Sequence, residues 1–270
     1  ACEGYSSQAI YTIIDPDATP RLSPGTPEYK AALKTIKETK NFGTGSGFVS
    51  KSKIYDFEGM YDFEDRLGFI NLQVGGNYKM YRPVTEGSVY SDAASTVAVH
   101  GPIEANEFGV FAQVSKAVLN NNLKLQGSIR LDGHSNFDNH ISPRVSGVYS
   151  LNEFQHIRAS YQSGFANPTI QSQYLDVDLG VQHSIGGSED NAKRLGLTQV
   201  FEAGLVSNGS GGYDTVKTNY LIAQEQNSFE VGFKGLMNKN LYIDMNYYQT
   251  KYEKPFRSKD IIDPNTAVVN

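Results

Sequence analysis

The chain has 270 residues and a formal net charge of −5 at pH 7, and only 20% of its residues are charged. Neither half carries the basic patch that binding to phosphates needs, so nucleic acid is excluded as a partner. Tyrosine (17), phenylalanine (14) and glycine (26) are abundant, and this composition is typical of strands and loops rather than helices. No apolar run reaches the roughly 18 residues of a transmembrane helix. The lone cysteine, Cys2, excludes an internal disulfide and a cysteine-based zinc site.

The first predicted element in the chain is a helix over residues 27–40. Thr26 suits the N-cap position, and Pro27 suits the first helical position. An apolar stripe follows at helical spacing and is formed by Tyr29, Leu33 and Ile36. A shorter and weaker helix pattern covers residues 189–195.

Most of the remaining chain alternates between apolar and polar residues with a period of two. In residues 122–132 one face carries Leu123, Leu125, Ile129 and Leu131, whereas the opposite face carries Lys124, Gln126, Ser128, Arg130 and Asp132. Seven other segments share this pattern, at 52–63, 68–80, 106–116, 143–151, 155–165, 227–235 and 240–250. Each of these segments is predicted to be a strand with one apolar face and one polar face.

The length of these strands favours a membrane barrel over a soluble sheet. Soluble strands average about 5–6 residues, whereas several of these segments are about twice as long. About ten residues at ~3.3 Å each, tilted by ~45°, rise about 24 Å, which matches the ~25 Å apolar band of an outer-membrane barrel. Alternation alone does not decide the environment, because a soluble sandwich strand also has one apolar and one polar face. A soluble all-β binding or adhesion domain therefore stays open as an alternative.

The connections between the predicted strands sort by length. Short turns are expected at 64–65, 120–121, 152–153 and 238–239, and long connections are expected at 83–105, 133–142 and 166–226. All short turns then lie at one end of the sheet, as the periplasmic turns of outer-membrane barrels do. The flanking segments, 1–51 and 253–270, fall on the long-loop side and are interpreted as outer loops. Because the termini of a complete outer-membrane barrel lie on the periplasmic side, we expect an internal segment of a larger barrel.

Five blocks of the sequence resemble the barrel of TonB-dependent receptors. They are residues 130–137, 142–149, 157–161, 164–169 and 227–235. Their order and spacing are similar to that family from about residue 50 to residue 252, although Ala166 stands where the family usually has arginine. The long loop at 166–226 resembles that of the large receptors with an extra N-terminal domain. The resemblance implies an all-β fold, a segment of a large antiparallel transmembrane β-barrel, with about 22 strands in the family and about eight here.

The resemblance also implies a function. The chain is expected to be part of a transporter that imports a scarce or bulky solute across the outer membrane, and not an enzyme. In the family an N-terminal plug gates the barrel, and neither the plug nor the remaining strands are expected within these residues. The expected partners are the TonB complex through parts outside this sequence, outer-membrane lipid, an unknown solute and a surface lipoprotein. A non-transporting barrel that acts as a scaffold or secretion-associated component is the alternative.

Four charged residues on the polar faces are the candidate ligand-contacting or lumen-wall residues. They are expected near the long-loop ends of their strands and are Arg130, Asp132, Arg144 and Glu230. Such residues either contact the solute in the outer vestibule or form a cross-strand salt ladder that holds the wall together. His134 and His140 share one segment, but two histidines alone do not predict a metal site. No nucleophile-elbow pattern is present, and no catalytic, cofactor-binding or metal-binding residue is predicted.

Overall fold

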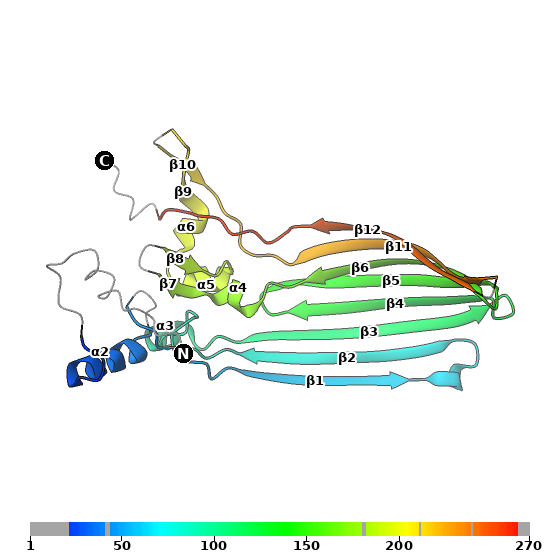
Figure 1. Cartoon of the computed structure of the whole chain (residues 1–270), viewed down its shortest axis with the longest axis horizontal. Coiled ribbons are helices and arrows are strands. Elements are labelled where there is room, and N and C mark those ends of the chain that lie inside the picture. The colour runs from blue at the N-terminus through cyan, green and yellow to red at the C-terminus, as the bar shows by residue number, and fades with distance from the viewer. Residues whose placement is uncertain (1–21, 41–43, 180–181, 211, 239, 264–270) are drawn as a thin grey trace. The chain divides into compact units, whose positions relative to one another are not determined.

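The computed structural model describes residues 22–40, 44–179, 182–210, 212–238 and 240–263 (Figure 1). Cys2 lies outside the described residues. The chain divides into two compact units, each built from separate stretches of sequence. The loop unit combines Ala1–Ser52, Pro83–Ile103 and Ile170–Thr198, and the sheet unit combines Lys53–Arg82, Glu104–Thr169 and Gln199–Asn270.

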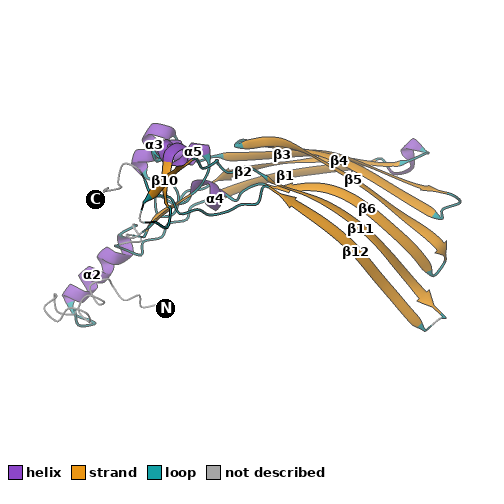
Figure 2. Ribbon diagram, turned by 90° about the horizontal axis from the view of Figure 1, so that it is seen from above, coloured by secondary structure: helices purple, strands orange, loops and turns teal. Residues whose placement is uncertain are grey.

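The sheet unit contains one eight-stranded antiparallel sheet, with the order β1-β2-β3-β4-β5-β6-β11-β12 (Figure 1). The strands are β1 Lys53–Asp62, β2 Asn71–Arg82, β3 Ala105–Val118, β4 Leu123–His134, β5 Phe137–Asn152, β6 Gln155–Ala166, β11 Gln224–Met237 and β12 Leu241–Glu253. Their lengths run from 10 to 16 residues, and the sheet bends across its width (Figure 2). The expected all-β, antiparallel architecture is therefore confirmed.

The connection between β4 and β5 differs from the expectation. A long loop was predicted over residues 133–142, but the two strands continue and leave only Ser135 and Asn136 between them. The imidazole Nδ1 of His134 accepts a hydrogen bond from the backbone N–H of Asn136 at 2.9 Å. The hydroxyl of Ser135 accepts another from the N–H of Asn106 on the neighbouring strand, at 3.1 Å. These side chains stabilise a tight turn, so one of the three connections at this end of the sheet is short.

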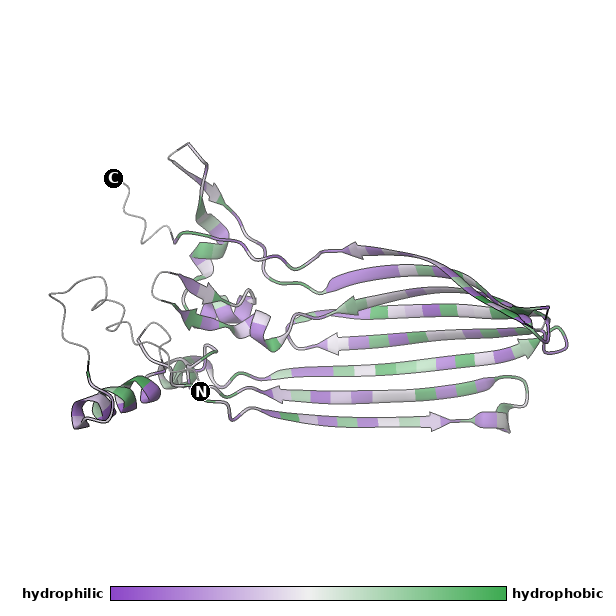
Figure 3. Cartoon of the chain, in the orientation of Figure 1, coloured by the Kyte–Doolittle hydropathy of each residue, from purple (hydrophilic) through white to green (hydrophobic). Residues whose placement is uncertain are grey.

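Cross-strand register assigns each strand residue to one of two faces. Ser128 lies opposite Gln113 and Arg144, whereas Ile129 lies opposite Pro143. Because successive side chains of a strand point to opposite sides, Ser128 belongs to a polar face and Ile129 to an apolar face. The alternating colours along each strand in Figure 3 follow this pattern. The apolar face includes Tyr55, Phe57, Leu72, Val110, Leu125, Ile129, Val145, Ile157, Val231 and Ile243.

The apolar face of the sheet is not covered by other parts of the described chain. Ile129 and Val145 are each 54% exposed, and Val110 is 51% exposed. Of the apolar residues that are buried among the described residues, only Ala105 belongs to one of the eight strands. Soluble monomers rarely expose a continuous apolar surface of this extent. The face therefore requires a cover of similar polarity.

The sheet unit also carries short elements between β6 and β11. Helix α6 spans Thr198–Ala203, and β9 Gly204–Ser207 pairs with β10 Tyr213–Val216 in a two-stranded sheet. The Phe201 ring packs on Tyr220 at a centroid distance of 5.0 Å. Leu205 exchanges two backbone hydrogen bonds with Ile262, so the segment after β12 is attached to this subsheet.

The loop unit begins with helix α2, Pro27–Glu38, which ends two residues before the predicted boundary. The hydroxyl of its N-cap residue, Thr26, accepts a hydrogen bond from the Tyr29 N–H at 3.2 Å. The other elements of the unit are α3 Ala94–His100, α4 Ile170–Tyr174, β7 Asp176–Asp178, β8 His183–Ile185 and α5 Glu189–Arg194. Helices α3 and α4 were not anticipated from the sequence. None of the helices in the described part of the chain has the length and apolar content to cross a membrane.

The loop unit is held together by buried polar side chains. The Asn191 amide accepts a hydrogen bond from the Ser91 hydroxyl at 2.5 Å and donates to the carbonyls of Leu175 and Gly186. Asn191 is fully buried. Two backbone bonds run beside it, from Ser91 to Tyr174 and from Asp176 to Val89. The segments 83–103 and 170–198, far apart in sequence, are thereby joined.

Candidate functional site

Arg130 and Asp132 form the most closely paired charges on the polar face. The Arg130 Nε–H donates to both Asp132 carboxylate oxygens, at 2.7 and 3.0 Å. Both residues lie on β4 two positions apart, so their side chains share a face. The other end of the guanidinium, Nη2, donates to Asn77 Oδ1 on β2. Asp132 is therefore held as part of a chain that joins two non-adjacent strands.

A glycine on the intervening strand makes this reach possible. Gly109 on β3 lies opposite Asp132 on one side and Asn77 on the other. A Cβ atom at position 109 would clash with Arg130 Nη2 and with Asp132 Oδ1. The missing side chain lets the guanidinium cross β3.

These groups line a pocket of about 320 Å³ at the end of the sheet where β2 ends and β3 begins. We call it the loop-end pocket, and its lining residues are Asn77, Lys79, Glu107, Phe108, Arg130, Asp132, Gly133, Phe165 and Asn167. Of the four candidate residues, Arg130 and Asp132 belong to it. Its other polar residues were not predicted as site residues, because no periodic pattern in the sequence relates them to β4.

The remaining charged side chains of the loop-end pocket also have partners within the protein. Lys79 Nζ lies 3.1 Å from a carboxylate oxygen of Asp56 on β1. Glu107 accepts a hydrogen bond from the Tyr81 hydroxyl at 3.1 Å, and the His134 imidazole lies 3.6 Å from its carboxylate. The pocket therefore contains balanced charges.

Glu230 lies in a second cluster, and Arg144 lies in neither. The Arg158 guanidinium is 3.6 Å from Glu230 and donates to Asp244 at 3.1 Å and to Asn246. Arg158 was read only as a polar-face residue, although its three partners come from two strands. Arg144 is exposed, and no ion pair to it occurs among the described residues. The four candidates thus occupy three places on the polar face.

The two histidines contact aromatic rings. The His134 side chain is 2% exposed, and its ring lies 4.7 Å from that of Phe137. His140 stacks on Phe165 at 4.5 Å with an interplanar angle of 15°. Within the described residues no group of three or more histidine, cysteine, aspartate or glutamate side chains is arranged to hold a metal ion.

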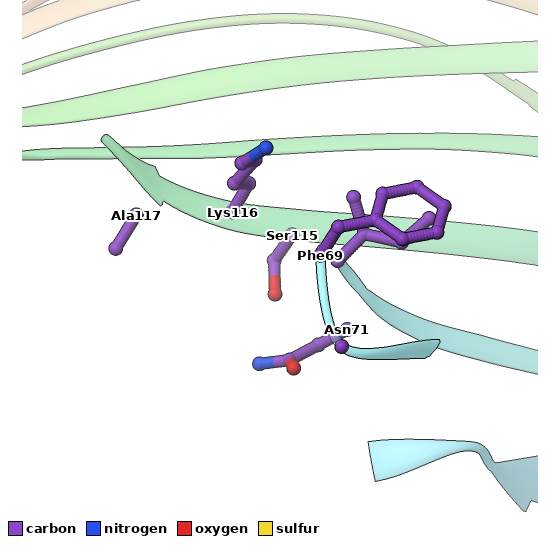
Figure 4. A pocket seen from close by; sticks show the side chains of 7 residues that line it. Phe69, Asn71, Ser115, Lys116 and Ala117 are labelled. Atoms are coloured by element: carbon purple, nitrogen blue, oxygen red, sulfur yellow. The ribbon is translucent and has the colours of Figure 1, made fainter. Parts of the chain in front are cut away.

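A second hollow lies at the opposite end of the sheet. Its volume is about 420 Å³, and it is lined by residues 68–71 and 115–117 (Figure 4). Phe69 on its rim is 64% exposed. The lining offers Lys116 as its single charged side chain, so it lacks the convergent polar groups of the loop-end pocket.

Comparison with known proteins gives a match over nearly the whole chain. A family model described as "TonB dependent receptor-like, beta-barrel" matches residues 6–268. No match was found among curated protein sequences.

Two solved structures share the fold. The siderophore receptor PirA from Pseudomonas aeruginosa aligns with a TM-score of 0.51 at 18% identity, over 76% of this chain and 33% of that chain. A mutant of the ferric enterobactin receptor PfeA from the same species aligns with a TM-score of 0.50 at 16% identity, over 75% of this chain and 27% of that chain. The chain therefore spans at most about a third of the length of these receptors.

Proposed function

This chain belongs to the TonB-dependent receptor β-barrel family, and from that premise we propose that its strands form part of the wall of an energy-coupled importer. Receptors of this family are outer-membrane proteins and not enzymes. The proposed role of the chain is to supply barrel wall and outer vestibule, while gating belongs to parts of the receptor outside this sequence.

The observation that carries this proposal is the difference between the two faces of the sheet. The apolar face is exposed along its length, as contact with hydrocarbon requires, and the polar face carries ion pairs, as a water-filled interior allows. The proposed outer position of the loop-end pocket follows from its place where two of the three connections are long. Arg130, Asp132, Arg144 and Glu230 are proposed as lumen-wall residues, and the first two as solute contacts.

The proposed partners are the TonB complex, outer-membrane lipid, a surface lipoprotein and a scarce or bulky solute. The names of the two matched structures identify them as receptors for siderophores. At 16% and 18% identity the likeness supports the fold, and it does not extend the siderophore to this chain.

In vivo cross-linking tests the energy coupling without knowledge of the solute. The complete receptor, expressed in a Gram-negative host, is treated with formaldehyde and examined for an adduct that contains both the receptor and TonB. We expect such an adduct. A host receptor already known to contact TonB serves as the positive control in the same cells. If that control cross-links and this receptor does not, the non-transporting scaffold is the better description.

A further inference from the structure

The loop-end pocket contains no uncompensated positive charge. Two cations and two anions line it, Lys79 and Arg130 against Glu107 and Asp132. Arg130 is paired with Asp132 at 2.7 Å, and Lys79 is paired with Asp56 outside the lining at 3.1 Å. An anionic solute is favoured by positive charge that no protein carboxylate compensates, and here both cations already contact carboxylates.

Asp132 is the residue that compensates Arg130. Its side chain is 14% exposed, against 36% for the Arg130 side chain. Both carboxylate oxygens accept from the same Nε–H, so the pair is held in one geometry. An anion approaching Arg130 therefore meets the negative charge of Asp132 as well, in a partly desolvated site where charges interact more strongly than in water.

A second feature of the pocket also disfavours anions. The side-chain oxygen of Asn167, one of the lining residues, is buried and has no hydrogen-bond partner among the described residues. A buried acceptor without a donor is costly, and a hydroxyl or amide N–H of a bound molecule would satisfy it. A carboxylate group has only acceptors and would leave this oxygen without a donor. Phe108 and Phe165 contribute apolar lining beside these polar groups.

We infer that Asp132 is a specificity-determining residue that closes the loop-end pocket to anions, so that the part of the solute entering it is uncharged and donates hydrogen bonds. This inference rests on the proposed importing function, because it assigns the pocket to the solute. In this role Asp132 determines which solute charge the pocket accepts, whereas in a cross-strand salt ladder it would only hold the wall together.

Citrate is a suitable anionic probe, and Asp132→Asn is the informative variant. In the complete receptor, purified in detergent, the wild type is expected to show little citrate binding by titration calorimetry. Asp132→Asn keeps the size and hydrogen-bonding shape of the side chain and frees the charge on Arg130. We expect citrate affinity to rise by about tenfold or more, since a hydrogen bond to a charged group exceeds the factor-of-ten threshold of 1.4 kcal/mol. The gain should diminish as salt is added.

The matched control is Asp244→Asn in the second cluster. It makes the same change in net charge on the same face, but Arg158 keeps Glu230 at 3.6 Å as a partner. Citrate affinity should stay at the wild-type value. The double variant Arg130→Gln with Asp132→Asn should lose the gain, and circular dichroism and cooperative melting of each variant show that the barrel is folded.

Three outcomes overturn the inference. They are citrate binding by the wild type as tight as by Asp132→Asn, no gain in a folded Asp132→Asn variant, and an equal gain in Asp244→Asn. Each is independent of the cross-link to TonB, so failure of charge selection and failure of the importing function are distinguishable.

Discussion

At the scale of single residues, the polar face is organised by side chains that reach across a strand. Arg130 contacts Asn77 over Gly109, and Arg158 contacts partners on both β11 and β12. Surface ion pairs contribute at most about 1 kcal/mol each. These arginines therefore contribute little to the free energy of unfolding. Their main effect is to hold charged side chains of different strands at defined positions on the polar face.

Glu86 shows how the loop unit uses charge outside the sheet. Its carboxylate accepts from Lys40 Nζ at 2.6 Å and from Lys51 Nζ at 2.5 Å. Hydrogen bonds from Lys40 and then Lys51 lower the pKa of the Glu86 carboxyl from its ordinary 4.5 to about 2. One residue thus joins two points of the segment before β1 to the connection after β2.

The lowered pKa predicts a pH window for this junction. Because the folded-state pKa is below the unfolded value, the contribution to stability is fully present above pH 4.5 and is lost as the pH falls through about 2. The Lys51 amide, which donates to the Val84 carbonyl at 2.8 Å, reports on the junction. We expect its hydrogen-exchange protection, corrected for intrinsic rates, to fall between these pH values in the wild type. In Glu86→Gln the protection of the Lys51 amide should not change with pH in this window. Identical pH profiles of protection in the wild type and in Glu86→Gln would contradict the assignment.

At the scale of elements, short segments of the loop unit depend on one another. Helix α5 has six residues, and α4 has five, which is too short for either to be stable alone. The buried amide of Asn191 connects α5 to the ends of α4 and β8 and to the segment before α3. These elements therefore form or open together.

Asn191→Ala tests this dependence. The substitution leaves the Ser91 hydroxyl and the Gly186 carbonyl without their partner, whereas the Leu175 carbonyl keeps the Gly186 N–H. We expect a cost of about 1–3 kcal/mol in the free energy of local opening. We expect faster amide exchange at Ser91 and at Gly186 alike, measured on the complete receptor in detergent. Glu189→Ala on the same helix removes an exposed i,i+4 pair with Lys193, worth about 0.3–0.5 kcal/mol, and leaves the buried Asn191 contacts in place. Faster exchange confined to residues 183–194 would show that the two segments are independent.

The sequence predicted the strands well because the period of two is a local property. The strand at 122–132, for example, corresponds to β4 at Leu123–His134. The loop predicted at 133–142 was wrong. The prediction favoured a loop because Gly133, Ser135 and Asn136 are common in loops and because Pro143 is unusual within a strand. Only the contacts of His134 and Ser135 show that a tight turn forms there.

The candidate site was predictable only where its residues share a strand. Arg130 and Asp132 are two positions apart, so alternation alone places them on one face. The contact of Arg130 with Asn77 depends on the register of three strands and on the absence of a side chain at Gly109. Asn167 lies beyond the end of β6, where no pattern applies. To predict a site whose residues come from several strands, one must know the register between those strands. Neither the composition nor the period of two in the sequence specifies that register.

At the scale of the whole molecule, the sheet is a wall between two solvents. Its apolar face has no protein core against it in the described chain, and its polar face carries the ion pairs. Receptors of this family reside in the outer membrane. Lipid hydrocarbon is therefore the medium that we expect to cover the apolar face. Stability of the apolar face should therefore depend on hydrocarbon rather than on packing within the chain.

Arginine placed on either face measures this dependence. Ile129 is 54% exposed on the apolar face, and Ile129→Arg brings a charge to hydrocarbon at a cost of about 2–4 kcal/mol near the bilayer midplane. The adjacent Ser128→Arg enters the polar face and should cost about 1 kcal/mol or less, with repulsion from Arg144 opposite it as the main term.

The measurement is reversible unfolding of the complete receptor in lipid vesicles, with tyrosine or intrinsic fluorescence as the signal. Ile243→Arg repeats the apolar-face change on β12 and should resemble Ile129→Arg, since the strand pairings place Ile243 on the same face as Ile129. In a detergent micelle the apolar-face variants should still be destabilised more than Ser128→Arg, because a micelle also presents hydrocarbon. Equal costs on the two faces would mean that Ile129 does not contact lipid, and the wall would then have to be packed against protein on its apolar side.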